Sequence, residues 1–315
     1  MTTRFTFRTV GRVPRLRVML VGWGGNNGPT LTAVVLANRL RLSWPTHSGH
    51  KEVNYYGSLT QGTVSLGLDA EDQEVFVPFS ALLPMSLNLA EEIQRAKVLD
   101  WELQEQLWLH MEALRPRPSV YIPEFIAANQ STCADSLIPD SREQRLEQIR
   151  KDIRDFRSSA GLDKVILLWT ANTEGFCEVV PGLNDTAENL LHTIELGLEV
   201  SPSTLFTVAS ILESCAFLNG SLQNTLVPGA LELACQRRMT LSGQTKVKSV
   251  LVDFFISSGL KTMLIVSYNH LGNNDGQNLL APLQFRSKEV SKSNVVDDMV
   301  QSNPVLYTPG EEPDH

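Results

Sequence analysis

Two lysines in the last part of the chain have the residue type and spacing that could do chemistry. Lys288 and Lys292 lie four positions apart, so on a helix their ammonium groups share one face and repel each other unless an anion lies between them. A lysine crowded by a second cation gives up its proton more easily, and the charged neighbour can stabilise an enolate or an alkoxide. The pair indicates an anion-binding catalytic site, with a solvated basic helix face as the alternative.

A glycine-rich turn near the N-terminus suggests phosphate binding. Gly22, Gly24 and Gly28 follow an apolar run from Val18 to Val21. Glycines let the backbone turn sharply and approach a pyrophosphate, and the N–H groups that open the next helix face the anion. The spacing G-x-G-G-x-x-G is one residue longer than the usual dinucleotide pattern, and only Glu52 stands where its supporting acid is expected. The turn predicts a dinucleotide site, with a plain strand-to-helix connection as the alternative.

Two further polar segments could line a ligand. Thr170 to Thr173 follow the apolar run from Lys164 to Trp169, and ligands of open α/β sheets bind outside the carboxyl ends of the strands. A capped strand-to-helix turn would give the same pattern. The segment from Asn269 to Gly276 contains His270, and by default it is a turn with a structural histidine.

The elements that must position these residues alternate between strand and helix. This alternation predicts an α/β fold with a parallel sheet. We expect strands at residues 18–21, 53–56, 74–79, 164–169 and 261–268, with extended structure at 120–122. We expect helices from residue 29 or 30 onward and at residues 87–114, 141–158 and 247–260. Asp185 and Thr186 are expected to cap another helix that runs to Leu198. Residues 203–218 are expected to form a further helix or a buried run.

Composition limits the class of protein. The 315 residues are 42% hydrophobic, which suits one large or two ordinary domains, and the net charge of -8 argues against nucleic-acid or anionic-membrane partners. No apolar stretch reaches the length of a membrane span. We therefore expect a small-molecule ligand, a reducing and cytoplasmic location, and no metal, because zinc or disulfide spacing is absent among Cys133, Cys177, Cys215 and Cys235.

Eight segments, in this order, resemble the myo-inositol-1-phosphate synthase family: VGWGGNNGPTLTAVVLANR, NYYGSLTQ, FIAANQ, LWTANTE, PGLNDTAENL, SGQTKVKS, SYNHLGNNDG and FRSKEVSKSNVVDD. The resemblance covers almost the whole chain. It implies a lead-in at residues 1–14, a Rossmann-like NAD-binding domain at 15–246 and a second, incomplete α+β catalytic and tetramerisation domain at 247–315. It also implies a cytoplasmic, homotetrameric isomerase of inositol and phospholipid biosynthesis.

The resemblance further implies a reaction and the residues that carry it. Bound NAD oxidises C5 of D-glucose 6-phosphate, the ring closes by intramolecular aldol addition of an enol, and the same cofactor reduces the ketone to give 1D-myo-inositol 3-phosphate. Lys288 and Lys292 correspond to catalytic lysines of the family. The NAD-binding positions are Gly24, Gly25, Asn26, Asn27, Gly28, Gln130, Thr170, Ala171, Asn172, Thr173, Ser242, Asn273 and Asn274. The substrate-binding positions are Ser242, Gly243, Gln244, Asn269, Leu271, Asn273 and the two lysines.

The chain also departs from the family pattern. A segment with Gly-Trp-Asp between Met85 and Ser86 and an Asp-Asp-x-Lys segment before Ser242 are absent, and Cys133 and Gly175 replace arginines. The family continues beyond residue 315 to further lysines, so we expect this chain alone to turn over substrate very poorly. The alternative function is a catalytically dead variant that only binds NAD or joins oligomers. Without the resemblance, a generic NAD-dependent dehydrogenase is the runner-up.

Overall fold

The computed structural model describes residues 15–23, 25, 27–55, 63–68, 74–78, 94, 98–112, 114, 116–126, 137–138, 142–198, 200–221, 223–242 and 281–290. The chain divides into two compact units. The first comprises Met1–Pro116 and Arg154–Ile166, and the second comprises Arg117–Ile153 and Leu167–His315. The predicted boundary between residues 246 and 247 lies outside the described residues and stays a prediction.

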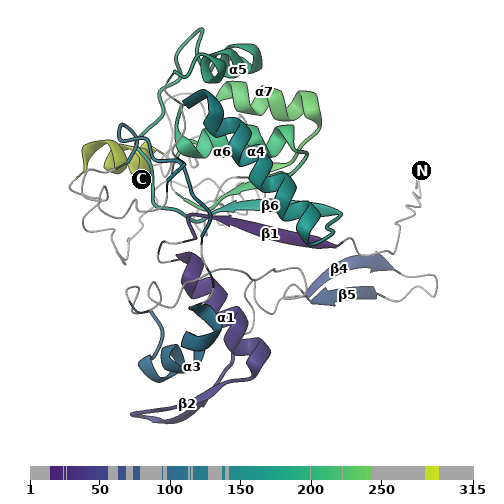
Figure 1. Ribbon diagram of the computed structural model, residues 1–315, viewed down its shortest axis with the longest axis vertical. Coiled ribbons are helices and arrows are strands. Elements are labelled where there is room, and N and C mark those ends of the chain that lie inside the picture. The colour runs from purple at the N-terminus through teal and green to yellow at the C-terminus, as the bar shows by residue number, and fades with distance from the viewer. Residues whose placement is uncertain are drawn as a thin grey trace, which may run out of the picture. The chain divides into compact units, whose positions relative to one another are not determined.

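The first unit begins with the strand and helix expected around the glycine turn. Strand β1 is Leu16–Val21, and helix α1 is Asn27–Leu40 (Figure 1). The helix begins two residues before Pro29, which corrects the expected start. The turn closes early because the N–H of Gly25 donates to the carbonyl of Gly22 at 3.0 Å, so the helix can begin immediately after it.

Two antiparallel hairpins follow in this unit. Strands β2 (Ser43–Thr46) and β3 (Gly49–Glu52) form the first, and β4 (Thr63–Leu68) and β5 (Glu74–Pro78) form the second, which confirms the strand expected from residue 74. The strand expected at 53–56 is wrong, because the described residues 53–55 have no strand structure. The hairpin lies earlier because Gly49 has φ +119° and its carbonyl accepts from the Thr46 hydroxyl at 2.7 Å, which closes a tight turn.

An apolar cluster forms the core of the first unit. Helix α3 (Trp101–Met111) packs against α1 and β2 (Figure 1). It is shorter than the helix expected at 87–114, and it begins immediately after Asp100. Burial of this many aliphatic and aromatic side chains supplies the main stabilisation of the unit. The cluster consists of Ala33, Leu36, Ala37, Trp44, Leu103, Leu107 and Met111.

Four strands form one sheet in the order β1-β6-β7-β8, in which β6 is Lys164–Trp169, β7 is Ala216–Asn219 and β8 is Leu241–Ser242. The N–H of Asp163 donates to the carbonyl of Arg15 at 2.9 Å, so β1 and β6 begin side by side. The N–H of Gly220 donates to the carbonyl of Trp169 at 3.0 Å, so β6 and β7 end side by side. These contacts fit parallel strands, and β7 and β8 are paired in parallel. The α/β fold with a parallel sheet is confirmed.

In the second unit, helices pack on one another and on β7. Helix α7 (Pro228–Arg237) packs against α5 (Ala187–Glu195) and α6 (Pro202–Leu212) (Figure 1). The segment expected as one helix or buried run at 203–218 contains α6 and the separate strand β7. Ser214 divides the two, because its φ of +55° cannot continue a helix.

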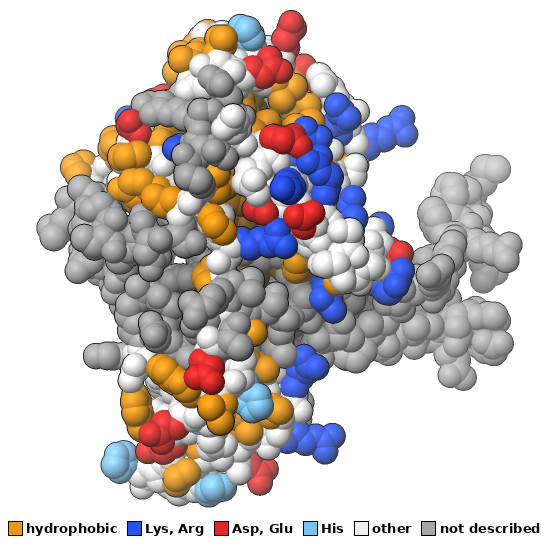
Figure 2. Space-filling view, viewed as in Figure 1, with side chains coloured by type: hydrophobic (Ala, Val, Ile, Leu, Met, Phe, Trp, Pro, Cys, Tyr) orange, Lys and Arg blue, Asp and Glu red, His pale blue; other side chains and the backbone are white. Residues whose placement is uncertain are grey.

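Helix α4 (Arg142–Ser159) confirms the charged amphipathic helix expected at 141–158. Its buried residues include Ile149 and Ile153. Figure 2 shows acidic and basic side chains interspersed over the face where α4 lies in Figure 1. In the described part of the chain, no helix is long and apolar enough to cross a membrane.

Candidate cofactor site

The glycine turn in the first unit has the close packing that a phosphate-binding turn needs. Gly22 has φ +81°, a conformation that side chains rarely adopt. A Cβ on Gly28 would lie 2.7 Å from the Cα, the Cδ1 and the carbonyl oxygen of Trp23. The indole N–H of Trp23 donates to the Thr32 hydroxyl at 2.8 Å, and that hydroxyl donates to the Gly28 carbonyl at 2.9 Å. The indole is thereby fixed over the helix start, where only glycine fits.

This geometry suits a pyrophosphate. Gly22 and Gly25 precede helix α1, whose N-terminus carries partial positive charge and attracts anions. Gly25 and Asn27, two of the predicted NAD-binding residues, lie in this turn and at the first position of the helix. Gly24 and Asn26, also predicted to bind NAD, lie outside the described residues.

In the second unit, predicted NAD-binding residues gather at the carboxyl ends of the strands. Thr170, Ala171, Asn172 and Thr173 directly follow β6. The Ser221 hydroxyl donates to the Ala171 carbonyl at 2.5 Å, so the loop after β7 lies against the loop after β6. The structure therefore places these four residues where an open α/β sheet binds its ligands, as predicted.

Ser242 belongs to the same edge. It is the last residue of β8, and its backbone pairs with Leu218 near the end of β7. Gly220 follows β7, and a Cβ there would lie 2.5 Å from the Trp169 carbonyl oxygen, so only glycine lets the two strand ends approach this closely.

A buried ring of hydrogen bonds supports the loop at residues 170–173. The N–H of Glu174 donates to Gln223 Oε1 at 2.7 Å, and Gln223 Nε2 donates to Thr225 Oγ1 at 3.2 Å. Thr225 Oγ1 donates to Ser203 Oγ at 2.8 Å, and Ser203 Oγ donates to Glu174 Oε2 at 2.6 Å. We call these four residues the Glu174 ring. They tie the segment after β6 to the start of α6 and to the loop after β7.

The carboxyl group of Glu174 is buried, and its pKa is raised. Glu174 is only 1% exposed. Burial raises the pKa of its carboxyl from 4.5 to about 8, against the lowering effect of hydrogen bonds from Ser203 and Ser201. The backbone N–H of Ser203 also donates to Glu174 Oε1 at 3.0 Å, so the carboxyl lies at the N-terminus of α6. At neutral pH the group is mainly protonated.

Lys288 lies on a helix at 282–290. The side chain is 9% exposed, and Gln284 and Ser287 are buried with it on the same helix. Gln284 Nε2 donates to the Phe125 carbonyl at 3.0 Å, and the N–H of Gly175 donates to that carbonyl at 2.7 Å. The lysine helix is therefore anchored to the residue that follows Glu174.

A charged contact strengthens this anchor. Arg286 Nη1 lies 2.6 Å from Glu178 Oε1, and the guanidinium lies 4.9 Å from the centre of the Phe176 ring. The segment from Thr170 to Glu178 thus carries the predicted cofactor loop at one end and holds the lysine helix at the other. This segment therefore connects the loop predicted to bind NAD with the helix that carries the predicted catalytic lysine, within the second unit.

The remaining predicted residues lie outside the described residues, and their roles stay predictions. Within the described part, no group of three or more His, Cys, Asp and Glu side chains could hold a metal ion. The residues outside it are Gln130, Gly243, Gln244, Asn269, Leu271, Asn273, Asn274 and Lys292.

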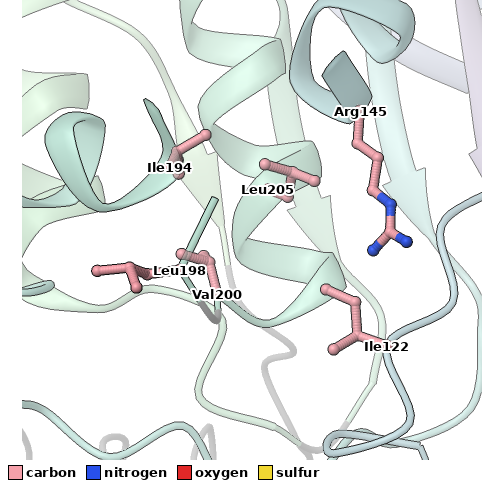
Figure 3. Close-up of a pocket in the computed structure, with 6 residues that line it drawn as sticks. All are labelled: Ile122, Arg145, Ile194, Leu198, Val200 and Leu205. Carbon is pink, nitrogen blue, oxygen red and sulfur yellow. The ribbon is translucent and has the colours of Figure 1, made fainter. Parts of the chain in front are cut away.

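A separate pocket in the second unit does not contain the predicted site residues. Figure 3 shows the pocket lined by Arg145, by Ile122 and by aliphatic side chains from α5, α6 and the segment that connects them. Its lining is apolar apart from this arginine, so it lacks the polar groups that would orient a nucleotide. The lining residues are Ile122, Arg145, Ile194, Leu198, Val200 and Leu205.

Sequence reasoning missed the Glu174 ring. Glu174 was noticed only as part of the motif LWTANTE, and no role was given to it. A usable signal was the Ser201-Pro202-Ser203 start of α6, where Ser201 caps the helix and accepts from the N–H of Thr204 at 3.2 Å. The pairing of that helix start with Glu174 joins residues 29 positions apart, which no local pattern reveals.

The glycine turn, the parallel sheet and the polar strand ends define an α/β domain of the NAD-binding, Rossmann type. A family model for NAD-binding domains, described as myo-inositol-1-phosphate synthase, matches residues 16–285. The chain belongs to the myo-inositol-1-phosphate synthase family, as its motifs indicated.

Individual relatives agree with the family match. The chain is 82% identical to inositol-3-phosphate synthase 1 of Homo sapiens over 335 residues, which cover 100% of this chain and 60% of the human protein. It is 54% identical to inositol-3-phosphate synthase of Drosophila melanogaster, again over 100% of this chain and 60% of the relative. The crystal structure of inositol-3-phosphate synthase from Caenorhabditis elegans matches with a TM-score of 0.80 and 46% identity, covering 96% of this chain and 64% of that chain.

The chain spans about 60% of the length of the curated relatives it matches. The human alignment runs over 335 residues against the 315 of this chain. The difference of 20 aligned positions agrees with the internal segments that the motif comparison found to be absent.

Proposed function

We propose that this chain has the function of its family, conversion of D-glucose 6-phosphate to 1D-myo-inositol 3-phosphate with bound NAD. The observation that carries the proposal is identity of 82% to human inositol-3-phosphate synthase 1 along the whole of this chain. The bound cofactor supplies hydride removal and return, so the reaction has no net redox change. We further propose a cytoplasmic homo-oligomer, tetrameric as in the family, with no nucleic-acid or membrane partner.

The chain's own residues have separable tasks under this proposal. The turn at Gly25 and the helix start at Asn27 and Gly28 bind the pyrophosphate through the backbone, and residues 170–173 line the cofactor cleft. Lys288, fixed on its buried helix face, stabilises the negative oxygen that develops during enolisation and ring closure. Burial supports this role, because a cation acts more strongly on a developing oxyanion where water is excluded.

Binding and turnover test different parts of the proposal. NAD titration by calorimetry should show binding by the parent chain and at least about tenfold weaker binding by Gly25→Val, because a side chain there meets the Gly22 carbonyl oxygen at 3.1 Å. Leu109→Ala is the control, since Leu109 is 75% exposed on α3. Equal affinities for the parent and Gly25→Val would contradict the assigned phosphate turn.

Turnover is measured as inositol phosphate released from glucose 6-phosphate in the presence of NAD. Lys288→Ala should abolish whatever activity the chain has, while its NAD affinity stays close to that of the parent. If Lys288→Ala keeps full activity, the catalytic role of this lysine is wrong.

The second candidate is a chain that binds NAD or joins oligomers without turnover. The shorter span relative to the family members favours this candidate. NAD binding without inositol phosphate release, together with assembly into complete subunits on a sizing column, would support it over the enzyme.

A further inference from the structure

The Glu174 ring has a fixed direction. Gln223 Oε1 accepts the backbone N–H of Glu174, so the Gln223 amide must present its NH₂ group to Thr225. Thr225 has one hydroxyl proton, which goes to Ser203. Ser203 also has one, and it goes to Glu174 Oε2 at 2.6 Å. In this form of the ring each donor leads to the next, and the last of them, Ser203, donates to the carboxyl group.

The carboxyl group closes the ring in either protonation state. As a carboxylate, it accepts from the hydroxyl and the backbone N–H of Ser203. As a neutral acid, it still accepts the Ser203 N–H on Oε1 and donates its own proton to Ser203 Oγ, and the Ser203 hydroxyl proton then turns to Ser201 Oγ, 3.4 Å away. The neutral form avoids an unpaired charge in a site that is 1% exposed at Glu174 and 0% exposed at Ser203.

The ring lies immediately beside the predicted cofactor loop. Glu174 is the next residue after Thr173, and the hydroxyl of Ser221, on the same loop as Gln223, holds the Ala171 carbonyl. Opening the ring would release the Glu174 end of the loop at 170–173 from the segment after β7 and leave Ser221 as its remaining contact at Ala171.

We propose that Glu174 is a positioning residue of the cofactor site, whose buried carboxyl group closes the ring and thereby holds residues 170–173 in their NAD-lining conformation. This inference rests on the proposed function for its link to NAD. The ring itself is a property of the fold and can be tested without the cofactor.

The proposal gives the loop a pH dependence with a definite sign. The closed ring binds a proton up to about pH 8, whereas an open, solvated Glu174 loses it near the ordinary pKa of 4.5. Between these values, raising the pH favours opening by up to about tenfold per pH unit, and the effect levels off above about pH 8.

Other groups near Glu174 do not reproduce this profile. Burial raises the pKa of the Cys177 thiol to about 11, so the thiol stays neutral throughout the range. On the same segment, Glu178 is paired with Arg286 of the helix at 282–290, which also carries Lys288 and Glu289. From α6 and the loop after β7, the residues that face the carboxyl are the uncharged Ser201, Ser203 and Gln223.

Amide hydrogen exchange of the full chain without NAD tests the ring. After correction for the intrinsic exchange rate, protection of the Glu174 and Ser203 amides should fall on the order of tenfold or more from about pH 6 to about pH 8. Glu174→Gln, which mimics the neutral acid, should keep its protection across this range. The amides of α3 serve as an internal control, because no residue of the ring belongs to that helix.

NAD titration of the same proteins tests the link to the cofactor. Glu174→Ala removes both acceptors and should weaken NAD binding at least about tenfold, while Glu174→Gln should restore affinity close to that of the parent. If Glu174→Ala does not fold, Thr225→Val opens the ring without touching Glu174 and should weaken NAD binding in the same direction.

The outcomes separate the two claims. Protection at Glu174 that is identical in the parent and Thr225→Val overturns the ring, and parent protection that does not fall from about pH 6 to about pH 8 overturns its pH dependence. Parent protein that binds NAD no better than Glu174→Ala and Thr225→Val overturns the positioning role. A parent chain with the expected exchange profile but no NAD binding counts against the proposed function and removes the link to the cofactor, while the ring stands.

Discussion

The two units of the chain are stabilised in different ways. The core of the first unit is a cluster of apolar side chains, among which Leu103, Leu107 and Met111 are fully buried. The second unit also buries apolar side chains, but beside its predicted cofactor loop the buried residues are polar and joined by hydrogen bonds. Glu174 and Ser203 are the centre of this polar region.

This difference determines what each region tolerates. An apolar cluster depends on filled volume and changes little with pH, because it holds no titrating group. A hydrogen-bonded ring depends on having each donor matched to an acceptor, and one unmatched buried group costs more than the net gain of a formed bond. The stability of the first unit should therefore fall most when buried side-chain volume is lost. The stability of the polar edge of the second unit should fall most when a hydroxyl is lost or a charge is introduced.

The largest expected effect is loss of volume in the first unit. Leu107→Ala should reduce the free energy of unfolding of this unit by about 2–5 kcal/mol, because Leu107 is fully buried and the cavity cannot collapse completely. Leu109→Ala on the same helix is the matched control, since Leu109 is 75% exposed. Urea denaturation combined with amide exchange of α3 measures both, and equal losses would contradict the assigned core.

A smaller effect is expected when the ring loses one hydroxyl. Thr225→Val keeps the side-chain shape but leaves the Gln223 amide and Ser203 without their partner, so the second unit should lose about 1–3 kcal/mol. Thr225→Ser keeps the hydroxyl and is the control. Amide exchange at Glu174 reports the change locally. If valine and serine behave alike, methyl packing rather than the hydroxyl matters at this position.

A still smaller effect is expected at a helix cap outside the ring. The Thr186 hydroxyl accepts from the N–H of Asn189 at 3.2 Å at the start of α5. Thr186→Ala should cost about 1 kcal/mol, and Thr186→Ser much less. Thermal unfolding of the three proteins checks the order. A loss as large as that of Thr225→Val would mean that the ring is no more demanding than an ordinary cap.

The smallest effect is expected at a surface ion pair of the first unit. Arg15 Nε lies 3.7 Å from Asp163 Oδ2, and both side chains are exposed. Arg15→Met should change stability by about 0.2–1 kcal/mol at most, since the backbone N–H of Arg15 keeps its own hydrogen bond to Asp163. Denaturation at low and high salt measures this. A loss comparable to that of Leu107→Ala would show that surface charge, not apolar burial, stabilises the unit.

The comparison also explains which sequence predictions succeeded. The strand at 164–169 and the helix at 142–159 were predicted well, because hydrophobic periodicity over consecutive residues carries the signal. The predicted strand at 53–56 was wrong because the hairpin depends on the turn at Gly49. The run at 203–218 was not divided into helix α6 and strand β7, because α6 is buried on all sides and its sequence shows no apolar stripe at helical spacing.

By itself, the sequence determined the family, the α/β class and the glycine turn, because each depends on the types and spacing of residues that are close together in the sequence. It also placed Thr170 to Thr173 at a strand end. Only the tertiary structure decided that Glu174 is a buried acid within a closed ring. Its partners Ser203 and Gln223 come from 29 and 49 positions away, and burial and hydrogen bonding of a carboxyl group depend on which distant segments the fold brings to it.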